Sequence, residues 1–263
     1  MHNPMVTIHP DGPVVILTLN RPEQGNSLTP ELLTALLDAI AVARQYRGLR
    51  AVVLQAAGQT FSRGSDITAL VSQADRATYA AHLLDCLHRV ILELIDLPAP
   101  LIVAVQGPVN GSAIGFVLVA DVVLVTPEAT FTAYATTLGL GPEGGWATLL
   151  PRLIGQRRAA ETLLLERSIS AAEAVAWGLA NRLIPTSHLT EEAQAIAHQI
   201  AAQFPGSVAC ARRLLWRERD QLAEALRCER ETFCVQIQSI EADIGLKAFL
   251  DRQRALSQME AEP

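Results

Sequence analysis

Lysine is almost missing from this chain of 263 residues. Lys247 is the only lysine, and the other 20 of the 21 basic residues are arginine. The chain therefore has almost no lysine to offer a phosphate group, and arginine is not interchangeable with lysine in that role. Because 27 acidic residues outnumber the basic ones, the formal net charge is −6. This charge argues against a broad nucleic-acid-binding surface, and we expect no nucleic-acid partner.

Cysteines and long apolar runs are also scarce. The four cysteines are too few for a disulfide scaffold, and their spacing lacks the paired pattern of a structural zinc site. The longest apolar stretch, Ile114 to Val125, contains Asp121 and is shorter than the about 20 residues that cross a bilayer. Residues 1–10 lack a basic region followed by an apolar one. We therefore expect a cytoplasmic protein with no membrane partner.

Half of the residues are hydrophobic and 18% are charged, which is enough for a sizeable core. Val14 to Leu19 is a β-branched strand pattern, and residues 29–31 (Thr-Pro-Glu) are a helix start. An apolar stripe at helical spacing follows between residues 32 and 40, and Ala51 to Leu54 forms the next strand. Strand, helix and strand in this order predict a βαβ unit with parallel strands.

The same alternation continues more loosely along the chain. It predicts helices over Asp75 to Leu97 and from Gly111 or Ser112 to Ala120, and strands over Leu101 to Val105 and Val122 to Val125. The stretch from Leu189 to Gln258 looks almost wholly helical. Its many arginines are interpreted as a solvated or subunit-facing surface with Glu–Arg pairs rather than as a basic docking surface. The fold class is α/β, with a core over residues 1–195 and a helical region over residues 196–263.

Two glycine turns follow strands and precede helices. They are residues 61–66 (Phe-Ser-Arg-Gly-Ser-Asp) and residues 107–113 (Gly-Pro-Val-Asn-Gly-Ser-Ala). Such turns expose backbone N–H groups, and two facing turns could hold an oxyanion. Backbone geometry alone also explains glycine at these places. Ser112 lacks the flanking glycines of a serine-hydrolase elbow, and neither turn is a phosphate-binding Walker loop.

Glu143 lies in a third glycine-rich segment, residues 138–146. A carboxylate on such a loop suits a general base or a nucleophile. The alternative is an acid at the N-terminus of a helix over Trp146 to Leu153, satisfied by the helix dipole. His82 and His88 lie on the predicted helix over Asp75 to Leu97, where a lone histidine is more often structural. No histidine has metal-ligand spacing, and we expect no metal.

Together these segments resemble the crotonase superfamily, the family of enoyl-CoA hydratases and isomerases. The resemblance runs from about Val6 to Arg252. The segments that resemble family motifs are residues 19–28 (Leu-Asn-Arg-Pro-Glu, then Asn-Ser-Leu), 61–66, 100–107, Ala120-Asp121, 139–145 and 174–181 (Ala-Val-Ala-Trp-Gly-Leu-Ala-Asn).

The resemblance implies a crotonase-like spiral of ββα turns with a C-terminal helical region that assembles trimers, often stacked into hexamers. It also implies an acyl-thioester substrate whose carbonyl oxygen lies between the N–H groups of Ser65 and Ser112. No separate cofactor is implied, because coenzyme A is part of the substrate. The substrate-binding and coenzyme-A-binding positions that the resemblance implies are Arg21, Arg63, Gly64, Asp66 and Gly111.

Two positions depart from the hydratases, which carry two catalytic glutamates: the matching residues here are Gly115 and Ala135. Neither can move a proton, so hydration is disfavoured. Glu143 resembles the acidic base of the dienoyl-CoA isomerases and the aspartate nucleophile of 4-chlorobenzoyl-CoA dehalogenase. The dehalogenase also has a histidine at the position of His88. We therefore predict Glu143 as the working carboxylate and His88 as a second catalytic group.

The sequence leaves two candidates for the group that carries the acyl thioester: coenzyme A and a carrier protein. The lysines that often bind the nucleotide are absent, and Arg21 and Arg254 are the candidate replacements. We predict an acyl-CoA enzyme that stabilises an enolate and catalyses isomerisation or another proton transfer. The alternatives are a thioester-binding or scaffold protein without activity, an enzyme for acyl groups on a carrier protein, and hydrolytic chemistry on Glu143.

Overall fold

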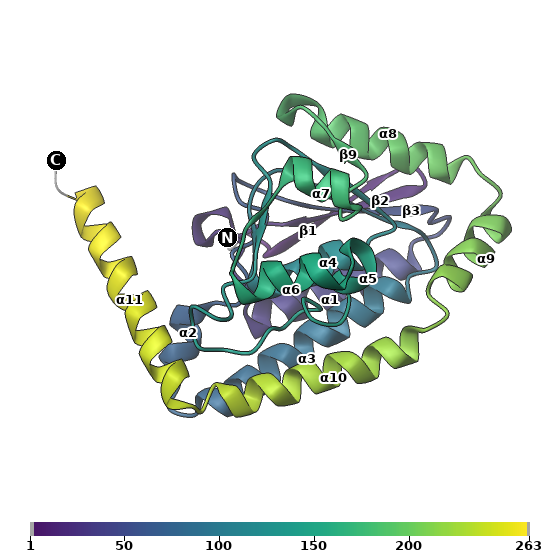
Figure 1. Ribbon diagram of the computed structural model, residues 1–263. Helices are drawn as coiled ribbons and strands as arrows, with labels where there is room; N and C mark the ends of the chain where they lie inside the picture. Colours follow the sequence, from purple (N-terminus) through teal and green to yellow (C-terminus); the bar gives the residue numbers. More distant parts are fainter. Residues whose placement is uncertain (1–2, 262–263) are drawn as a thin grey trace.

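A six-stranded sheet forms the centre of the computed structural model, which describes residues 3–261 (Figure 1). Its strands in spatial order are β1 (Val6–Asp11), β2 (Val14–Leu19), β3 (Ala51–Ala56), β4 (Leu101–Val105), β6 (Val122–Val125) and β9 (Arg182–Leu183). Neighbouring strands are parallel except β1, which pairs antiparallel with β2. The predicted βαβ unit is confirmed by the parallel β2–β3 pair. The sequence prediction missed β1.

A second, three-stranded sheet takes up strands between those of the first sheet, and the chain therefore follows a spiral path. It contains β5 (Val109–Asn110), β7 (Thr130–Thr132) and β8 (Ile169–Ser170). After β4 the chain adds β5 to this sheet and then forms the 3-10 turn η2 (Gly111–Ala113) and helix α4 (Ile114–Leu118). After β6 it adds β7 and later forms α5 (Leu150–Ile154) and α6 (Gln156–Leu164). Each turn of the spiral is thus a ββα unit, as the family resemblance implied.

Helices cover both faces of the large sheet because its buried strands are apolar on both sides. Helices α1 (Pro30–Gln45) and α3 (Arg76–Ile95) pack on one face, and α8 (Leu189–Ala201) packs on the other. Helices α1 and α3 begin where the sequence predicts. The Thr29 side chain accepts a hydrogen bond from the N–H of Leu32, and that of Asp75 accepts one from Thr78.

The remaining helices are short segments between or after the strands and a C-terminal series of longer helices. They are η1 (Pro22–Gln24), α2 (Ile67–Val71), α7 (Ala171–Trp177), η3 (Thr186–His188), α9 (Pro205–Leu215), α10 (Arg219–Gln236) and α11 (Ile240–Ala261). Helix α10 runs beside α3, and α11 leaves the body near α2 (Figure 1). Within residues 3–261, none of the helices has both the length and the apolar character that a membrane crossing requires.

The predicted boundary after residue 195 falls inside α8. Ala193 and Ile196, on either side of it, both pack on the same face of the sheet. The part of the chain that covers the sheet therefore continues to the end of α8, and the helices that leave the sheet begin with α9. Positions 1–2 and 262–263 of the two predicted regions lie outside the described residues.

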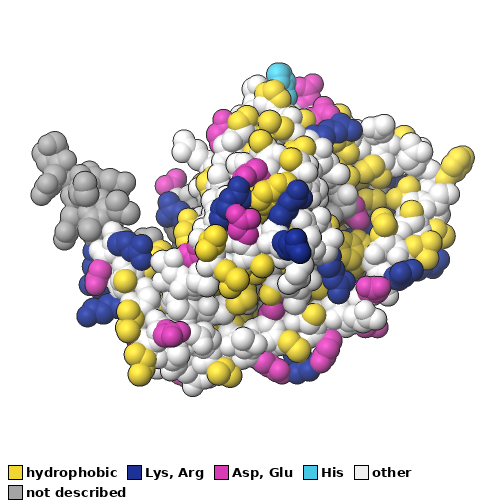
Figure 2. All heavy atoms as spheres, viewed as in Figure 1, with side chains coloured by type: hydrophobic (Ala, Val, Ile, Leu, Met, Phe, Trp, Pro, Cys, Tyr) yellow, Lys and Arg dark blue, Asp and Glu magenta, His cyan; other side chains and the backbone are white. Residues whose placement is uncertain are grey.

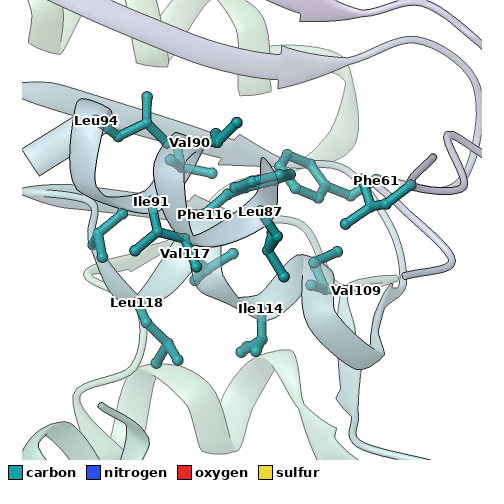
Figure 3. Packing of buried hydrophobic residues seen from close by; sticks show 14 of the residues in the cluster. Phe61, Leu87, Val90, Ile91, Leu94, Val109, Ile114, Phe116, Val117 and Leu118 are labelled. Atoms are coloured by element: carbon teal, nitrogen blue, oxygen red, sulfur yellow. The ribbon is translucent and has the colours of Figure 1, made fainter. Parts of the chain in front are cut away.

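The core between α3 and α4 supports the glycine turns. Leu87 and Ile91 of α3 lie on the side of α4 that carries Val117, and Phe61 packs at the edge of the same cluster (Figure 3). Phe61 is fully buried immediately before the first predicted glycine turn. Because protein interiors are closely packed, this cluster fixes the backbone from which the first two turns project.

One buried ion pair attaches α9 to the body of the protein. The Nε atom of Arg212 donates a hydrogen bond of 2.7 Å to the carboxylate of Asp121, and both side chains are largely buried. The same guanidinium also donates to the backbone carbonyl oxygens at the C-terminal end of α3, those of Leu94, Ile95 and Leu97. A single side chain thus satisfies the carbonyl groups that a helix end leaves without intrahelical partners.

We expect Arg212→Ala to lower the free energy of unfolding by about 3–5 kcal/mol, because it leaves a buried carboxylate and several carbonyl groups without a donor. Urea unfolding followed by circular dichroism measures the loss. Arg213→Ala is the matched control, since the Arg213 side chain is exposed and its hydrogen bond goes to the sulfur of exposed Cys210. Equal stability of the two variants would contradict the role of this ion pair.

Candidate active site

Three glycine turns meet at one place, and they come from separate parts of the chain. Gly64 and Gly144 both have positive φ, at 77° and 71°. A Cβ atom at Gly64 would lie 2.5 Å from the carbonyl oxygen of Asn110, and one at Gly144 would lie 2.5 Å from that of Ser112. The turns therefore pack backbone against backbone, which only glycine allows at these two positions. The indole N–H of Trp146 donates to the carbonyl oxygen of Gly111 at 2.8 Å and adds a further link.

The two serines predicted as backbone donors lie side by side. The Oγ atoms of Ser65 and Ser112 are 2.8 Å apart. Leu28 donates to the carbonyl oxygen of Gly64 and accepts from the N–H of Asp66, so the N–H of Ser65 points to the opposite side of the strand. Within the described residues neither serine N–H donates a hydrogen bond. The structure thus brings two free backbone donors together, as an oxyanion site requires.

The carboxylate of Glu143 lies beside these serines. Its Oε1 atom accepts a hydrogen bond of 2.9 Å from the Ser65 hydroxyl, and its Oε2 atom is buried without a partner among residues 3–261. Burial raises the pKa of Glu143 to about 7, although the hydroxyl groups of Ser65 and Ser112 lower it. A carboxyl group with such a pKa can accept or release a proton near neutral pH.

Helix α10 holds the loop that carries Glu143, a feature that the sequence analysis did not find. The carboxylate of Glu229 accepts hydrogen bonds of 2.9, 3.1 and 2.9 Å from the N–H groups of Gly145, Ala147 and Thr148. Glu229 is only 6% exposed, and burial raises its pKa. Its charge also raises the pKa of Glu143. In the sequence, Glu229 is one of several acids in an arginine-rich and glutamate-rich stretch, and nothing there distinguishes it.

The helix predicted over Trp146 to Leu153 is shorter in the structure. Residues 145–149 form turns, and α5 begins only at Leu150. The reason is the positive φ of Gly144 and Gly145 together with the acceptor that Glu229 supplies to the following N–H groups. Glu143 is therefore not an acid in the first turn of a helix, and the loop interpretation of the sequence holds.

A cavity of about 770 Å³ opens in front of the serines and Glu143. Its volume is within the range of sites for small molecules. Its wall contains polar side chains, including Ser65, Asp66 and Glu143, together with Phe233 and Phe249 from the C-terminal helices. Arg63 and Arg252 are the basic residues of its wall in the part of the chain that is described.

The other predicted binding residues are divided between the cavity and its support. Arg63, Asp66 and Gly111 line the cavity, and the Asp66 carboxylate also caps α2. Gly64 lies behind the wall, where its carbonyl oxygen pairs with Leu28. Arg21 does not line the cavity, because its guanidinium turns back to the carbonyl oxygen of Ser27 and the hydroxyl of Thr29.

His88 is buried in α3 and is absent from the cavity wall. Burial lowers its pKa to about 4, so the imidazole is neutral at pH 7, and its Nε2 atom has no partner in the described residues. Arg230 favours the neutral form and Asp85 opposes it. The structure thus brings together Glu143, Ser65 and Ser112 but leaves His88 outside this group. No cluster of three or more His, Cys, Asp or Glu side chains suited to a metal ion occurs within residues 3–261.

Comparisons with known proteins identify the family of this chain. The family model described as enoyl-CoA hydratase/isomerase matches residues 11–258. A protein of Mycobacterium bovis named "Probable enoyl-CoA hydratase" is 36% identical over 218 residues, which are 81% of this chain and 76% of that protein. The 1,2-epoxyphenylacetyl-CoA isomerase of Escherichia coli is 29% identical over 250 residues, or 93% of this chain and 95% of that protein.

The solved structures confirm the fold. The crystal structure of enoyl-CoA hydratase from Bacillus halodurans superimposes with a TM-score of 0.86 at 24% identity, over 93% of this chain and 99% of that one. The spiral of ββα turns is thus the same. The named reactions of the relatives include both hydration and isomerisation, so the family does not by itself specify the reaction.

We expect the raised pKa of Glu143 to make stability depend on pH. Its stabilising contribution is fully present below pH 4.5 and is lost as the pH rises to about 7, because the unfolded chain then loses a proton that the folded one keeps. Relative to Glu143→Gln, the wild type should lose about 3 kcal/mol of unfolding free energy over this interval. Urea unfolding at several pH values measures the slope. The exposed Glu23→Gln variant should keep the wild-type slope, and the same slope in Glu143→Gln would contradict this ionisation.

We expect Glu229→Gln to lower the pKa of Glu143, because it removes a nearby negative charge. It should also lower the free energy of unfolding by about 1–3 kcal/mol, since an amide cannot accept all three N–H groups well. A ¹³C NMR titration of glutamate-labelled protein reports the first effect, and urea unfolding the second. Glu231→Gln, an exposed position on the same helix, is the control. A Glu143 titration that is identical in all three proteins would refute the electrostatic coupling.

Proposed function

Because the chain belongs to the enoyl-CoA hydratase/isomerase family of the crotonase superfamily, we propose that it transfers a proton within acyl-CoA thioesters, with Glu143 as the base. The observation that carries this proposal is the position of the buried Oε2 atom of Glu143. Among residues 3–261 this atom has no hydrogen-bond partner, and it lies close to two free backbone N–H groups. A thioester carbonyl oxygen held by the N–H groups of Ser65 and Ser112 would place its neighbouring carbon near this carboxylate.

The proposed reaction begins with removal of a proton from carbon by Glu143. The electron pair moves onto the carbonyl oxygen and forms an enolate, which the two N–H groups stabilise by about 3 kcal/mol each. The protonated Glu143 then returns the proton, to the same carbon or to another carbon of the conjugated system. Return to another carbon is isomerisation. The pKa of about 7 suits a group that must both take and give a proton.

Gly115 and Ala135 argue against hydration. Hydratases of this family use two glutamates at the matching positions, and Ala135 lines the cavity without any group that could activate water. A Cβ atom at Gly115 would lie 2.5 Å from Ile91 Cδ1 and 2.9 Å from the carbonyl oxygen of Gly144. The loop that carries Glu143 therefore occupies the space that a first glutamate needs. One acid remains in contact with the serines, which fits proton transfer within the substrate.

Coenzyme A is the proposed handle, and no separate cofactor enters the reaction. Arg63 and Arg252 on the cavity wall are available for a phosphate-bearing group. A homotrimer or hexamer is proposed for the assembly. Apolar side chains support it: they are exposed over α9 and at the start of α11 (Figure 2), and they include Phe204, Leu214, Leu215, Ile240 and Ile244. Such exposed patches are typical of interfaces.

We expect Glu143→Gln to slow deuterium uptake next to the thioester carbonyl by at least about 100-fold, because general base catalysis is lost. Mass spectrometry in deuterated water measures uptake across a panel of acyl thioesters on coenzyme A and on carrier protein. Binding of the same thioesters should persist, and Glu23→Gln is the control. Binding with no uptake or isomerised product for any member of the panel would favour a thioester-binding protein without activity.

A further inference from the structure

We infer that Ser65 is a nucleophile activated by Glu143, so that the same cavity also transfers acyl groups from thioesters to the Ser65 hydroxyl and hydrolyses them. This inference rests on the thioester site of the proposed function and adds a second reaction to it. Neither hydroxyl group has a part in the proton transfer described above. The family resemblance assigns only the backbone N–H groups of the two serines.

Contacts select Ser65 among the serines at the site. Its hydroxyl donates to Glu143 Oε1 at 2.9 Å, and the residue is half-buried on the cavity wall. Ser112 is fully buried behind it. Ser27 also lines the cavity, but its hydroxyl donates to the backbone carbonyl oxygen of Gln24. A nucleophile must both reach the substrate and contact its base, and Ser65 meets both conditions.

The backbone of Ser65 places its hydroxyl correctly. In serine proteases the nucleophile's own N–H is one of the two donors that hold the oxyanion, so one residue can supply a donor and an attacking oxygen. The N–H of Ser65 is free in the described structure, and the second donor, the N–H of Ser112, belongs to a neighbouring residue. A carbonyl oxygen held by both places the carbonyl carbon next to the Ser65 hydroxyl.

Glu143 and Ser112 complete the arrangement. In most serine hydrolases histidine takes the proton, and here a carboxylate with a pKa of about 7 has the matching affinity for it. The Ser65 hydroxyl has one proton, which it donates to Glu143, so the Ser112 hydroxyl at 2.8 Å is the donor in the serine pair. This second hydrogen bond orients the Ser65 oxygen and stabilises negative charge on it. The glycine-flanked elbow of serine hydrolases is absent, but the hydrogen bonds that activate and orient the Ser65 hydroxyl are present.

The reaction balances with water as the only added reactant. The Ser65 oxygen forms a bond to the carbonyl carbon while its proton moves to Glu143. The carbon–sulfur bond then breaks, and the thiol leaves with the proton from Glu143. Water attacks the carbonyl carbon of the resulting ester and gives a proton to Glu143. The bond between this carbon and the Ser65 oxygen then breaks, and Glu143 returns the proton to that oxygen. The products are a carboxylic acid and a free thiol.

Benzoyl-CoA separates this reaction from the proposed function, because a benzoyl thioester has no hydrogen on the carbon next to the carbonyl. It can form no enolate, so release of thiol reports acyl transfer alone. Butanoyl-CoA has such hydrogens and can undergo both reactions. Deuterium uptake into butanoyl-CoA therefore tests the proposed function, and thiol release together with a protein adduct tests the inference.

The experiment compares the full-length wild type with Ser65→Ala, Ser65→Cys and Ser72→Ala. Ser72 is the matched control, since its hydroxyl lies at the end of α2 and donates to the carbonyl oxygen of Ala69. Calorimetry records binding, a thiol reagent records hydrolysis, and peptide mass spectrometry after acid quenching locates the acyl group. We expect an acyl adduct on Ser65 in the wild type and the control, and an adduct on the thiol of Ser65→Cys. Ser65→Ala should hydrolyse the bound thioesters at least about 100-fold more slowly.

Several outcomes would overturn the inference. Bound thioesters with no adduct on Ser65, or hydrolysis that is equal in wild type and Ser65→Ala, would exclude Ser65 as the nucleophile. An adduct on Glu143 or Ser112 instead would assign acyl transfer to another group. Deuterium uptake without any of the adducts would retain the proposed function and reject this one. Failure of both thioesters to bind would reject the shared site.

Discussion

The carboxylate of Glu229 is the constraint on which the site depends. It accepts three backbone N–H groups from the turn after Glu143, a segment in which glycines leave the backbone many conformations. With this turn held, Gly144 packs on Ser112 and the Glu143 side chain meets Ser65. Helix α10 thereby determines where the proposed base, Glu143, lies relative to the two proposed oxyanion donors.

The two buried carboxyl groups, Glu229 and Glu143, differ in how well their hydrogen bonds compensate for burial. Glu229 receives three N–H donors, which favour the charged form even though burial raises its pKa. Glu143 has only hydroxyl partners, and its second oxygen has none among the described residues, so it holds a proton up to about pH 7. This pairing of a well-bonded acid with a poorly bonded one resembles catalytic sites in which environment assigns separate roles to similar groups.

Periodicity and turn chemistry predicted much of the fold. The bounds of β2, β4 and β6 coincide with the predicted strands, because buried strands are short apolar runs between clear breaks. The turns with Ser65 and Ser112 and the loop with Glu143 could also be placed from the sequence, with the family resemblance giving their roles. The exposed pattern of β1 and the function of Glu229 could not, since both depend on partners distant in the sequence. His88 illustrates the same limit, because only packing decides whether a histidine faces a cavity.

The dependence of the Glu143 loop on α10 has a consequence for how the protein is made. During synthesis the ribosome releases the sheet, the glycine turns and Glu143 well before Glu229 emerges. Until α10 emerges and packs beside α3, the N–H groups of Gly145, Ala147 and Thr148 lack the acceptor that fixes them. In a nascent chain that already has its central sheet, the loop that carries Glu143 is therefore not yet held in place. The proposed base is therefore positioned only after α10 has been synthesised and has packed beside α3.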